Sequence, residues 1–219
     1  MSARQMHHTY IFDFDGTLVD SMPSWAEKVL SILRECGVEY PADIINIVTP
    51  LGDRGTAEYM RDVLGVPLAL EEIFRQMDEF ALPRYRDEIG FKEGVREYLS
   101  HLRRAGCTLH VLTASPHKMV DPCLGRLGVF DWFDHVWSTD DFGLVKSDPA
   151  IYRAAADRIG VDVDDVVFFD DNLSAIQTAA QVGVYTVGVY DASSAAYEND
   201  IRRAADLYVR TMADLPVTI

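Results

Sequence analysis

Two aspartates lie two residues apart in the stretch TYIFDFDGT (9–17), where an apolar run meets a glycine. Asp13 and Asp15 are followed directly by Gly16. Two carboxylates about 5 Å apart repel each other by roughly 3 kcal/mol at an effective dielectric constant near 20. Crowded acids are tolerated when a cation neutralises them or when their pKa rises. The spacing therefore indicates a site in which the carboxyl pKa values are raised or a cation is held.

Further polar side chains stand where the other apolar runs end, or in loops next to those ends. They are Thr113, Ser115, Lys146, Asp170, Asp171 and Asn172. Open parallel sheets bind their ligands at the carboxyl ends of the strands, so we expect these residues to gather with the first aspartate pair.

The ligands available at this edge are oxygen atoms, without a nearby histidine or cysteine, which favours a hard ion such as Mg²⁺. Magnesium held by a few carboxylates commonly completes its shell with phosphate oxygens. Lys146, the Thr113 hydroxyl and the backbone N–H groups at the Gly16 turn would contact the remaining phosphate oxygens. The residues together predict a phosphoryl-transfer site, in which positioning and charge neutralisation supply the catalysis.

The elements that must position these residues alternate between short apolar runs and helical patterns. The runs 9–14, 107–113, 135–138, 166–169 and 184–189 are typical of buried parallel strands. Helical patterns lie between them, with stops at Gly106, Gly160 and Gly183. Alternation of this kind predicts an α/β fold with helices on both faces of a parallel sheet.

Residues 20 to about 88 interrupt this alternation with a pattern that is helical throughout. The first helix starts near Ser21 and stops at Gly37, and the second covers about 55–64. The third helix runs through residues 70–85, and we expect Pro83 to end or kink it. The sequence thus predicts a helical unit inserted after the first strand.

The formal net charge of −15, from 35 acidic and 20 basic residues, argues against nucleic acid and anionic membranes as partners. An anionic substrate then needs local cations, which a metal ion would supply. The three cysteines show no metal-binding spacing, and no stretch approaches 18 consecutive apolar residues. We therefore expect a cytoplasmic enzyme with reduced thiols.

The motifs resemble those of the haloacid dehalogenase-like hydrolase superfamily, in its phosphatase branch. DFDGT, VLTAS, the lysine of VKSDP and FFDDN match the four family motifs, in the family's order. The resemblance implies a Rossmann-like parallel sheet core, an inserted all-helical cap domain and the cofactor Mg²⁺. It implies that Asp13 is the nucleophile that forms an aspartyl-phosphate, and that Asp15 is the general acid and base.

The resemblance also implies the remaining roles at the site. Phosphate would be bound by Thr113, Ala114 and Lys146. The metal ligands would be Asp13, Asp15 (through its backbone carbonyl), Asp170 and Asp171. Many members have glycine before the fourth-motif aspartate and another acid four residues after it, where this chain has Asp170 and Ala175. We therefore expect Asp171 to be the direct ligand and Asp170 a second one.

The expected domains are an α/β hydrolase core of residues 1–19 and 89–219 and a helical cap of residues 20–88. In the family such a cap closes over the site and excludes water. The segment TPLGDRG (49–55) corresponds to a substrate-selecting loop between two cap helices. Arg54 in this loop is a candidate for binding a substrate carboxylate or second phosphate, because a guanidinium forms bidentate bonds with either.

The favoured function is hydrolysis of a small phosphorylated metabolite by a monomer or weak homodimer. The alternative within the family is a sugar phosphomutase, but such mutases carry a histidine in the first cap helix where this chain has Trp25. A phospho-accepting receiver domain or an inactive binding module is disfavoured by the motif order, the helical insertion and the intact motifs. The physiological substrate stays open at this point.

Overall fold

The computed structural model describes residues 7–216 and 218–219. Its strands are β1 (Thr9–Phe12), β2 (Thr108–Thr113), β3 (His135–Ser138), β4 (Val166–Asp170), β5 (Tyr185–Val189) and β6 (Leu207–Val209). Its α-helices are α1 (Met22–Glu35), α2 (Ile44–Val48), α3 (Gly52–Asp62), α4 (Leu70–Asp87), α5 (Val95–Arg104), α6 (His117–Arg126), α7 (Ala150–Ile159), α8 (Leu173–Gln181) and α9 (Glu198–Ala204). The described residues divide into two compact units: those up to Asp20 together with 90–219, and those from Ser21 to Ile89.

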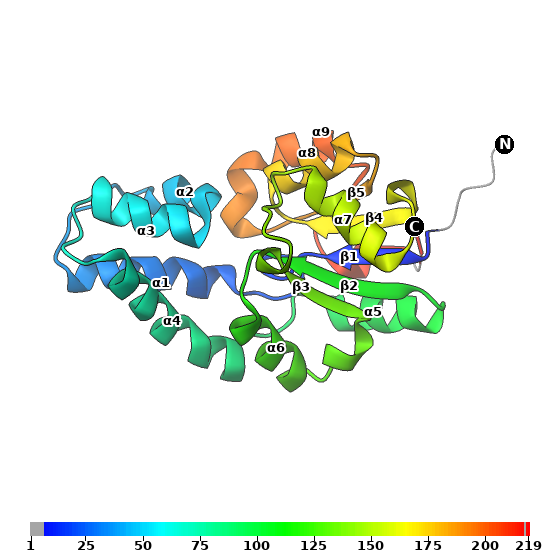
Figure 1. The fold of residues 1–219 in the computed structure, drawn as a ribbon, viewed down its shortest axis with the longest axis horizontal. Helices are drawn as coiled ribbons and strands as arrows, with labels where there is room; N and C mark the ends of the chain where they lie inside the picture. The colour runs from blue at the N-terminus through cyan, green and yellow to red at the C-terminus, as the bar shows by residue number, and fades with distance from the viewer. Residues whose placement is uncertain (1–6, 217) are drawn as a thin grey trace. The chain divides into compact units, whose positions relative to one another are not determined.

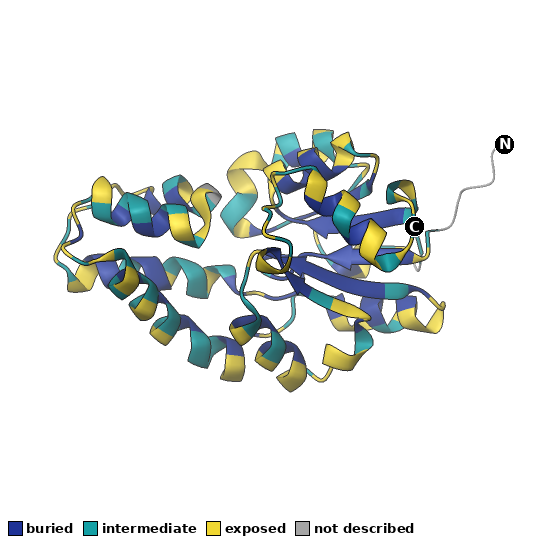
Figure 2. Cartoon of the chain, in the orientation of Figure 1, coloured by how far each residue is buried: buried dark blue, intermediate teal, exposed yellow. Residues whose placement is uncertain are grey.

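The larger unit contains a parallel sheet with the strand order β3-β2-β1-β4-β5-β6 (Figure 1). The central strands are almost wholly buried, as Figure 2 shows in dark blue. Burial on both faces explains why these strands are continuous apolar runs rather than alternating ones. The predicted α/β fold class is confirmed.

Alternate residues of the central strands pack on opposite sides of the sheet. On one side Ile11 and Phe168 pack with buried residues of α7 and α8, including Ile151 and Ala179. On the other side Phe12 stacks on Phe169, with ring centroids 4.7 Å apart, and Phe169 lies 5.9 Å from Tyr98 of α5. The two packed layers hold the strand ends rigidly, and the polar site is built on those ends.

The smaller unit consists of α1 to α4 around its own apolar core. Val29, Ile32 and Leu33 of α1 contribute the buried face that the helical spacing predicts. Buried residues of α3 and α4, among them Met60 and Ile73, complete this core.

The structure departs from two expectations for the helical unit, wholly in one case and in part in the other. Residues 49–55 do not form a loop, because Thr49–Leu51 are a short 3₁₀-helix and α3 already begins at Gly52. Thr56 stabilises this arrangement by donating its hydroxyl to the carbonyl of Val48, at 3.0 Å. Of the two effects expected of Pro83, the structure excludes the first, because helix α4 continues past the proline to Asp87, with the buried side chains Ala81 and Tyr85 on either side of it. Tertiary packing therefore outweighs the lost backbone hydrogen bond.

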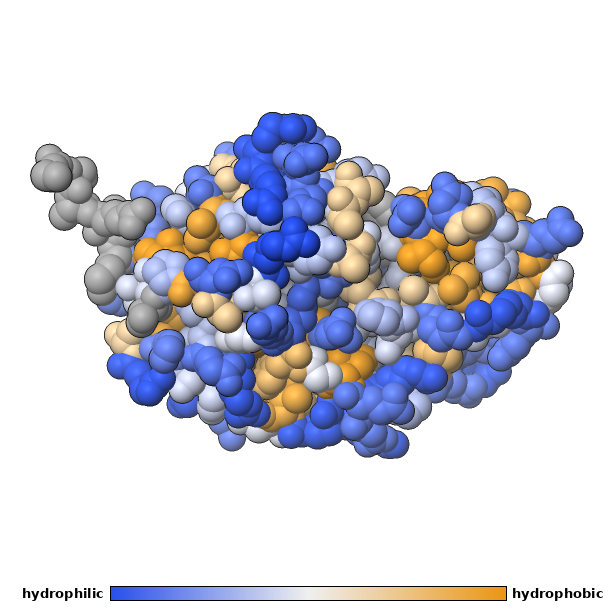
Figure 3. Space-filling model, turned by 180° about the vertical axis from the view of Figure 1, so that it is seen from behind, coloured by the Kyte–Doolittle hydropathy of each residue, from blue (hydrophilic) through white to orange (hydrophobic). Residues whose placement is uncertain are grey.

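The face displayed in Figure 3 is largely hydrophilic and is broken by apolar patches. None of the helices in the described part of the chain has both the length and the apolarity needed to cross a membrane.

Candidate active site

Two neighbouring strand ends bring the first acids together. Phe12 of β1 is in register with Phe169 of β4, so Asp13 follows one strand beside Asp170, the last residue of the other. The Asp13 N–H donates to the carbonyl of Phe169, at 2.9 Å, and extends the pairing by one bond. Both side chains are buried, with 5% and 0% of their surface exposed. The parallel register thus places two buried carboxylates side by side.

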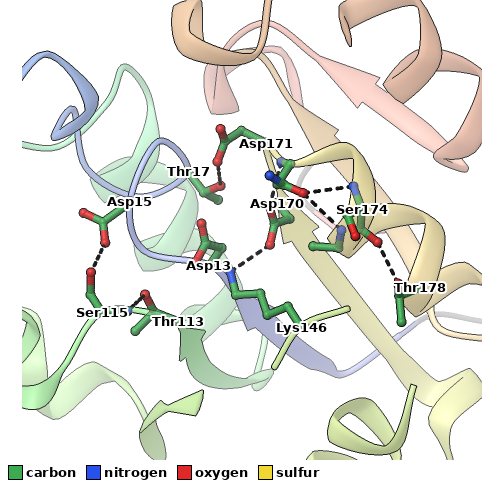
Figure 4. Close-up of polar contacts among 12 residues, drawn as sticks. Asp13, Asp15, Thr17, Thr113, Ser115, Lys146, Asp170, Asp171, Ser174 and Thr178 are labelled. Carbon is green, nitrogen blue, oxygen red and sulfur yellow. Dashed lines mark hydrogen bonds and ion pairs between the residues drawn. The ribbon is translucent and has the colours of Figure 1, made fainter. Parts of the chain in front are cut away.

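Lys146 lies between these two acids, as Figure 4 shows. Its ammonium pairs with Oδ1 of Asp13 and, at 2.9 Å, with Oδ2 of Asp170. The hydroxyl of Tyr152 in α7 donates to the Lys146 carbonyl at 2.9 Å and so anchors the backbone of the lysine. The other oxygen of Asp170 accepts the N–H of Asn172, at 2.7 Å. Asp170 is thus held on both oxygens.

Asp171 completes the acid cluster and is 7% exposed. Its Oδ1 accepts the hydroxyl of Thr17, at 3.3 Å. Asp13, Asp170 and Asp171 each offer a carboxylate oxygen, and these oxygens lie within 4.8 Å of one another. Asn172 caps α8 by accepting the N–H of Ser174, at 2.9 Å, and thereby fixes the turn that follows the two adjacent acids.

Lys146 alone does not balance the charge of this cluster. Three ionised acids and one lysine sum to −2 (−3 plus +1), in a region that excludes water. Burial, together with repulsion from Asp170, raises the pKa of Asp13 to about 7, against the attraction of Lys146. Burial, followed by repulsion from Asp170 and Asp13, holds the pKa of Asp171 well above its usual range.

A divalent ion held by oxygen ligands fits this donor set in both charge and chemistry. Its charge would offset the −2 of the cluster. The site thus has the composition that the sequence predicts for Mg²⁺.

The side chain of Asp15 points away from the acid cluster, as Figure 4 shows. Its Oδ2 accepts the hydroxyl of Ser115, at 2.5 Å. The hydroxyl of Thr113, at the end of β2, accepts the N–H of Ser115 at 3.0 Å and thus shapes the turn. Ala114 lies exposed between these two residues. The first and second motifs therefore meet at one loop, but Asp15 offers no carboxylate oxygen to the cluster.

Arg54 belongs to α3 of the helical unit, and 78% of its side chain is exposed. Its guanidinium lies 3.9 Å from Glu58 and 5.9 Å from the ring centroid of Phe74. The adjacent Asp53 is more firmly held, because Trp25 and the buried Lys28 both donate to its Oδ1 at 2.8 Å. Sequence reasoning singled out Arg54 and missed the contacts of Asp53.

Sequence reasoning also missed Lys92 and Asp191, which support the loop that carries Asp15 and Gly16. The Lys92 ammonium donates to the Gly16 carbonyl, 76 residues away in the chain, and to Oδ2 of Asp191. No motif or periodicity marks Lys92. Thr17, by contrast, lies within DFDGT and could have been inferred to contact the fourth motif.

A pocket of about 330 Å³ opens beside this loop in the α/β unit. Thr17, Lys92, Tyr190 and Asp191 are among its lining residues, and none of the predicted catalytic, phosphate-binding or metal-binding residues lines it. The acid cluster is therefore the better candidate for the chemistry, on the grounds of its buried charge.

Comparison with known proteins gives the same assignment as the motifs. Residues 7–183 match the family described as haloacid dehalogenase-like hydrolase. The phosphorylated carbohydrates phosphatase of Thermotoga maritima is 26% identical, over 80% of this chain and 81% of its own. A phosphoglycolate phosphatase of Pseudomonas putida is 28% identical, over 82% of this chain and 68% of its own.

Among solved structures, CbbY from Rhodobacter sphaeroides has a similar fold, with a TM-score of 0.83 at 22% identity over 96% of both chains. The family match covers all four motifs and most of the chain. The chain belongs to the haloacid dehalogenase-like hydrolases.

Proposed function

We propose that the protein hydrolyses phosphate monoesters of small metabolites in two steps, through a phosphorylated Asp13, with Mg²⁺ as cofactor. Family membership and relatives named as phosphatases make the chain a phosphoric monoester hydrolase. The observation that carries the finer proposal is the buried cluster of three acids against one lysine. Such a cluster suits a divalent ion and, with it, a phosphoryl group.

In the first step an oxygen of Asp13 attacks phosphorus, and the bond between phosphorus and the ester oxygen breaks. Asp15 gives its proton to the departing oxygen, so that the product leaves as an alcohol. The Ser115 hydroxyl orients the Asp15 carboxyl, through its bond to Oδ2. Lys146 favours the ionised form of Asp13 that the attack requires.

In the second step water attacks the phosphorus of the phosphorylated Asp13 while Asp15 takes a proton from it. Inorganic phosphate leaves and the Asp13 carboxylate is restored. Asp13, Asp170, Asp171 and the backbone carbonyl of Asp15 would hold Mg²⁺. When bound, the ion would neutralise charge on the phosphoryl oxygens. Thr113, Ala114 and Lys146 would contact the oxygens that the ion does not.

The experiment that tests this function combines a phosphate-ester screen with capture of the phosphorylated residue. The protein should release phosphate from several esters with Mg²⁺, and lose this activity in EDTA. Borohydride reduction during turnover should convert Asp13 to homoserine, detectable by mass spectrometry of the peptide, and Asp13→Asn should give no such product. Turnover without homoserine at position 13 would contradict the covalent step.

The sugar phosphomutase alternative is tested by the same reactions. The position that holds a histidine in such mutases is Trp25, whose indole N–H donates to Asp53 and cannot act as a general base. We therefore expect hexose phosphates to yield inorganic phosphate rather than isomers. Isomer formation faster than phosphate release would favour the mutase.

We also propose that the helical unit selects the substrate and that Arg54 binds its anionic end. The exposed guanidinium has a weak partner, at 3.9 Å, and is therefore available for a carboxylate or second phosphate. Arg54→Gln should raise KM for such substrates about tenfold with kcat nearly unchanged, since one charge-assisted contact contributes roughly 1.5 kcal/mol. Arg61→Gln is the matched control, because Arg61 lies in the same helix and pairs with the adjacent Asp62. Equal KM changes in both variants would refute the role of Arg54.

A further inference from the structure

Lys92 makes an unusually complete set of contacts beside the catalytic loop. Its ammonium donates to the carbonyls of Gly16 and Tyr190, each at 2.6 Å, and to Oδ2 of Asp191 at 2.7 Å. Its side chain is only 16% exposed. An ammonium has three N–H donors, so each of these acceptors takes one. Lys92 is therefore a fixed structural cation rather than a solvated charge.

The far side of this arrangement is rigid. Tyr190 and Asp191 directly follow β5, and Asp191 is 5% exposed. The second oxygen of Asp191 accepts both the N–H and the hydroxyl of Ser193, at 2.9 and 2.7 Å. The backbone N–H of Lys92 donates to the Leu18 carbonyl at 3.0 Å. The lysine thus connects the loop after β1 to a hydrogen-bonded turn after β5.

The near side of the arrangement reaches the acid cluster through Gly16. This glycine has φ = 76°, and a Cβ built on it would lie 2.8 Å from Oδ1 of Asp171. The carboxylate of Asp171 therefore rests directly against the Gly16 backbone. Thr17, the next residue, donates its hydroxyl to the same oxygen at 3.3 Å. A displacement of the Gly16 peptide would therefore move two things together: the backbone surface that the Asp171 carboxylate contacts, and the backbone of Asp15.

We infer that Lys92 is a positioning residue that holds the Gly16 peptide and thereby sets the place of Asp171 and of the Asp15 carbonyl for the metal ion. This inference rests on the proposed function and adds a residue that the four motifs do not contain. It accounts for a half-buried lysine whose donors are all directed at main chain and at an acid outside the cluster.

A purely electrostatic role for Lys92 makes the opposite prediction. A fixed positive charge near the cluster repels a metal ion, so its removal would strengthen Mg²⁺ binding. Loss of positioning would weaken Mg²⁺ binding, by about 10- to 100-fold, as is typical when a residue that orients metal ligands is removed. The direction of the change therefore separates the two roles.

The experiment measures Mg²⁺ binding by calorimetry on substrate-free protein, for wild type, Lys92→Gln and Lys92→Arg. We expect both variants to bind Mg²⁺ at least tenfold more weakly, because glutamine lacks the three donors and the larger planar guanidinium does not fit the same acceptors. Hydrogen exchange of the amides in residues 14–19 should be faster in both. Arg104→Gln removes an exposed charge from α5 in the same unit and should change neither quantity.

Binding by folded Lys92→Gln that is within threefold of wild type, or tighter, would overturn the inference, as would unchanged exchange in residues 14–19. If Lys92→Gln does not fold, Asp191→Asn serves instead, because it weakens one anchor of the ammonium while keeping the lysine. Loss of the Asp191 charge would by itself weaken Mg²⁺ binding, so hydrogen exchange decides for this variant. The amides of residues 14–19 should exchange faster, and unchanged exchange would overturn the inference. Absence of Mg²⁺ binding and of phosphatase activity in wild type would instead refute the proposed function, and the exchange measurement would still decide whether Lys92 positions the loop.

Discussion

Asp13→Asn should change how the stability of the metal-free protein depends on pH. Burial raises the pKa of Asp13 to about 7, from 3.8 for an unperturbed aspartate. Between about pH 4 and pH 7 the folded state keeps this proton while the unfolded state has lost it. The free energy of unfolding therefore falls as pH rises through this window, and the contribution levels off above it. Asparagine has a similar shape and no such proton, so the free energy of unfolding of the variant lacks this dependence on pH.

The magnitude follows from the difference between the two pKa values of Asp13. About three pKa units at 1.36 kcal/mol each amount to about 4 kcal/mol. In a chain of 219 residues, 1 kcal/mol corresponds to roughly 2–4 °C in Tm. Relative to wild type, the Tm of Asp13→Asn should therefore rise by roughly 8–16 °C between pH 4 and pH 8.

The assay is thermal unfolding in EDTA at several pH values, followed by circular dichroism, for both proteins. The difference between them removes the titration of groups that they share. Repeating the series with saturating Mg²⁺ should reduce the difference at pH 8, because an ion that binds the ionised cluster stabilises wild type by mass action. If the Tm values of the two proteins in EDTA change with pH in parallel, the view that burial raises the pKa of Asp13 in the metal-free protein is refuted.

Three further outcomes follow from the described contacts. Asp171→Ala should raise the Mg²⁺ concentration for half-maximal activity at least about tenfold, whereas Ser115→Ala should chiefly lower kcat; equal metal titrations would contradict the ranking. Gly16→Ala should weaken Mg²⁺ binding measured by calorimetry, because its Cβ would lie 2.8 Å from the Asp171 carboxylate at φ = 76°; wild-type affinity would show that the loop yields. Burial, with His135 nearby, lowers the pKa of His110 to about 4, so wild type should lose about 3 kcal/mol of stability as pH falls from 6.5 to 4. His110→Gln should lack this loss in denaturant titrations, and an equal loss in both proteins would disprove the assignment.

The sheet and the acid cluster were predictable because both depend on local patterns. Apolar runs with β-branched and aromatic residues identified five of the strands, and parallel pairing then places Asp13 and Asp170 side by side. Strand β6 escaped prediction because it is three residues long and only partly buried. The start of α3 at Gly52 was not predicted, because glycine ordinarily indicates a break in a helix. Here the packing of the residues that follow outweighs this preference.

The support of the site was not predictable in the same way. Lys92 contacts Gly16 and Asp191, which lie 76 and 99 residues away in the chain. Of the three segments involved, only the one that contains Gly16 carries a motif, DFDGT. The contact of Lys146 with Asp170 likewise depends on the folded loop that carries the lysine. Pairing across long separations is fixed by tertiary structure, and the local sequence pattern around each residue carries no trace of it.

The two ends of the helical insertion leave the α/β unit at one point. The N–H of Asp20 donates to the carbonyl of Gly90, at 3.0 Å, and Val19 pairs with Phe91 in an antiparallel bridge. A tight turn could therefore join these positions and replace the whole of residues 21–89 without disturbing a strand. Under the roles proposed for the two units, exchange of the insertion between relatives should change which substrate is bound while the residues of the α/β unit stay the same.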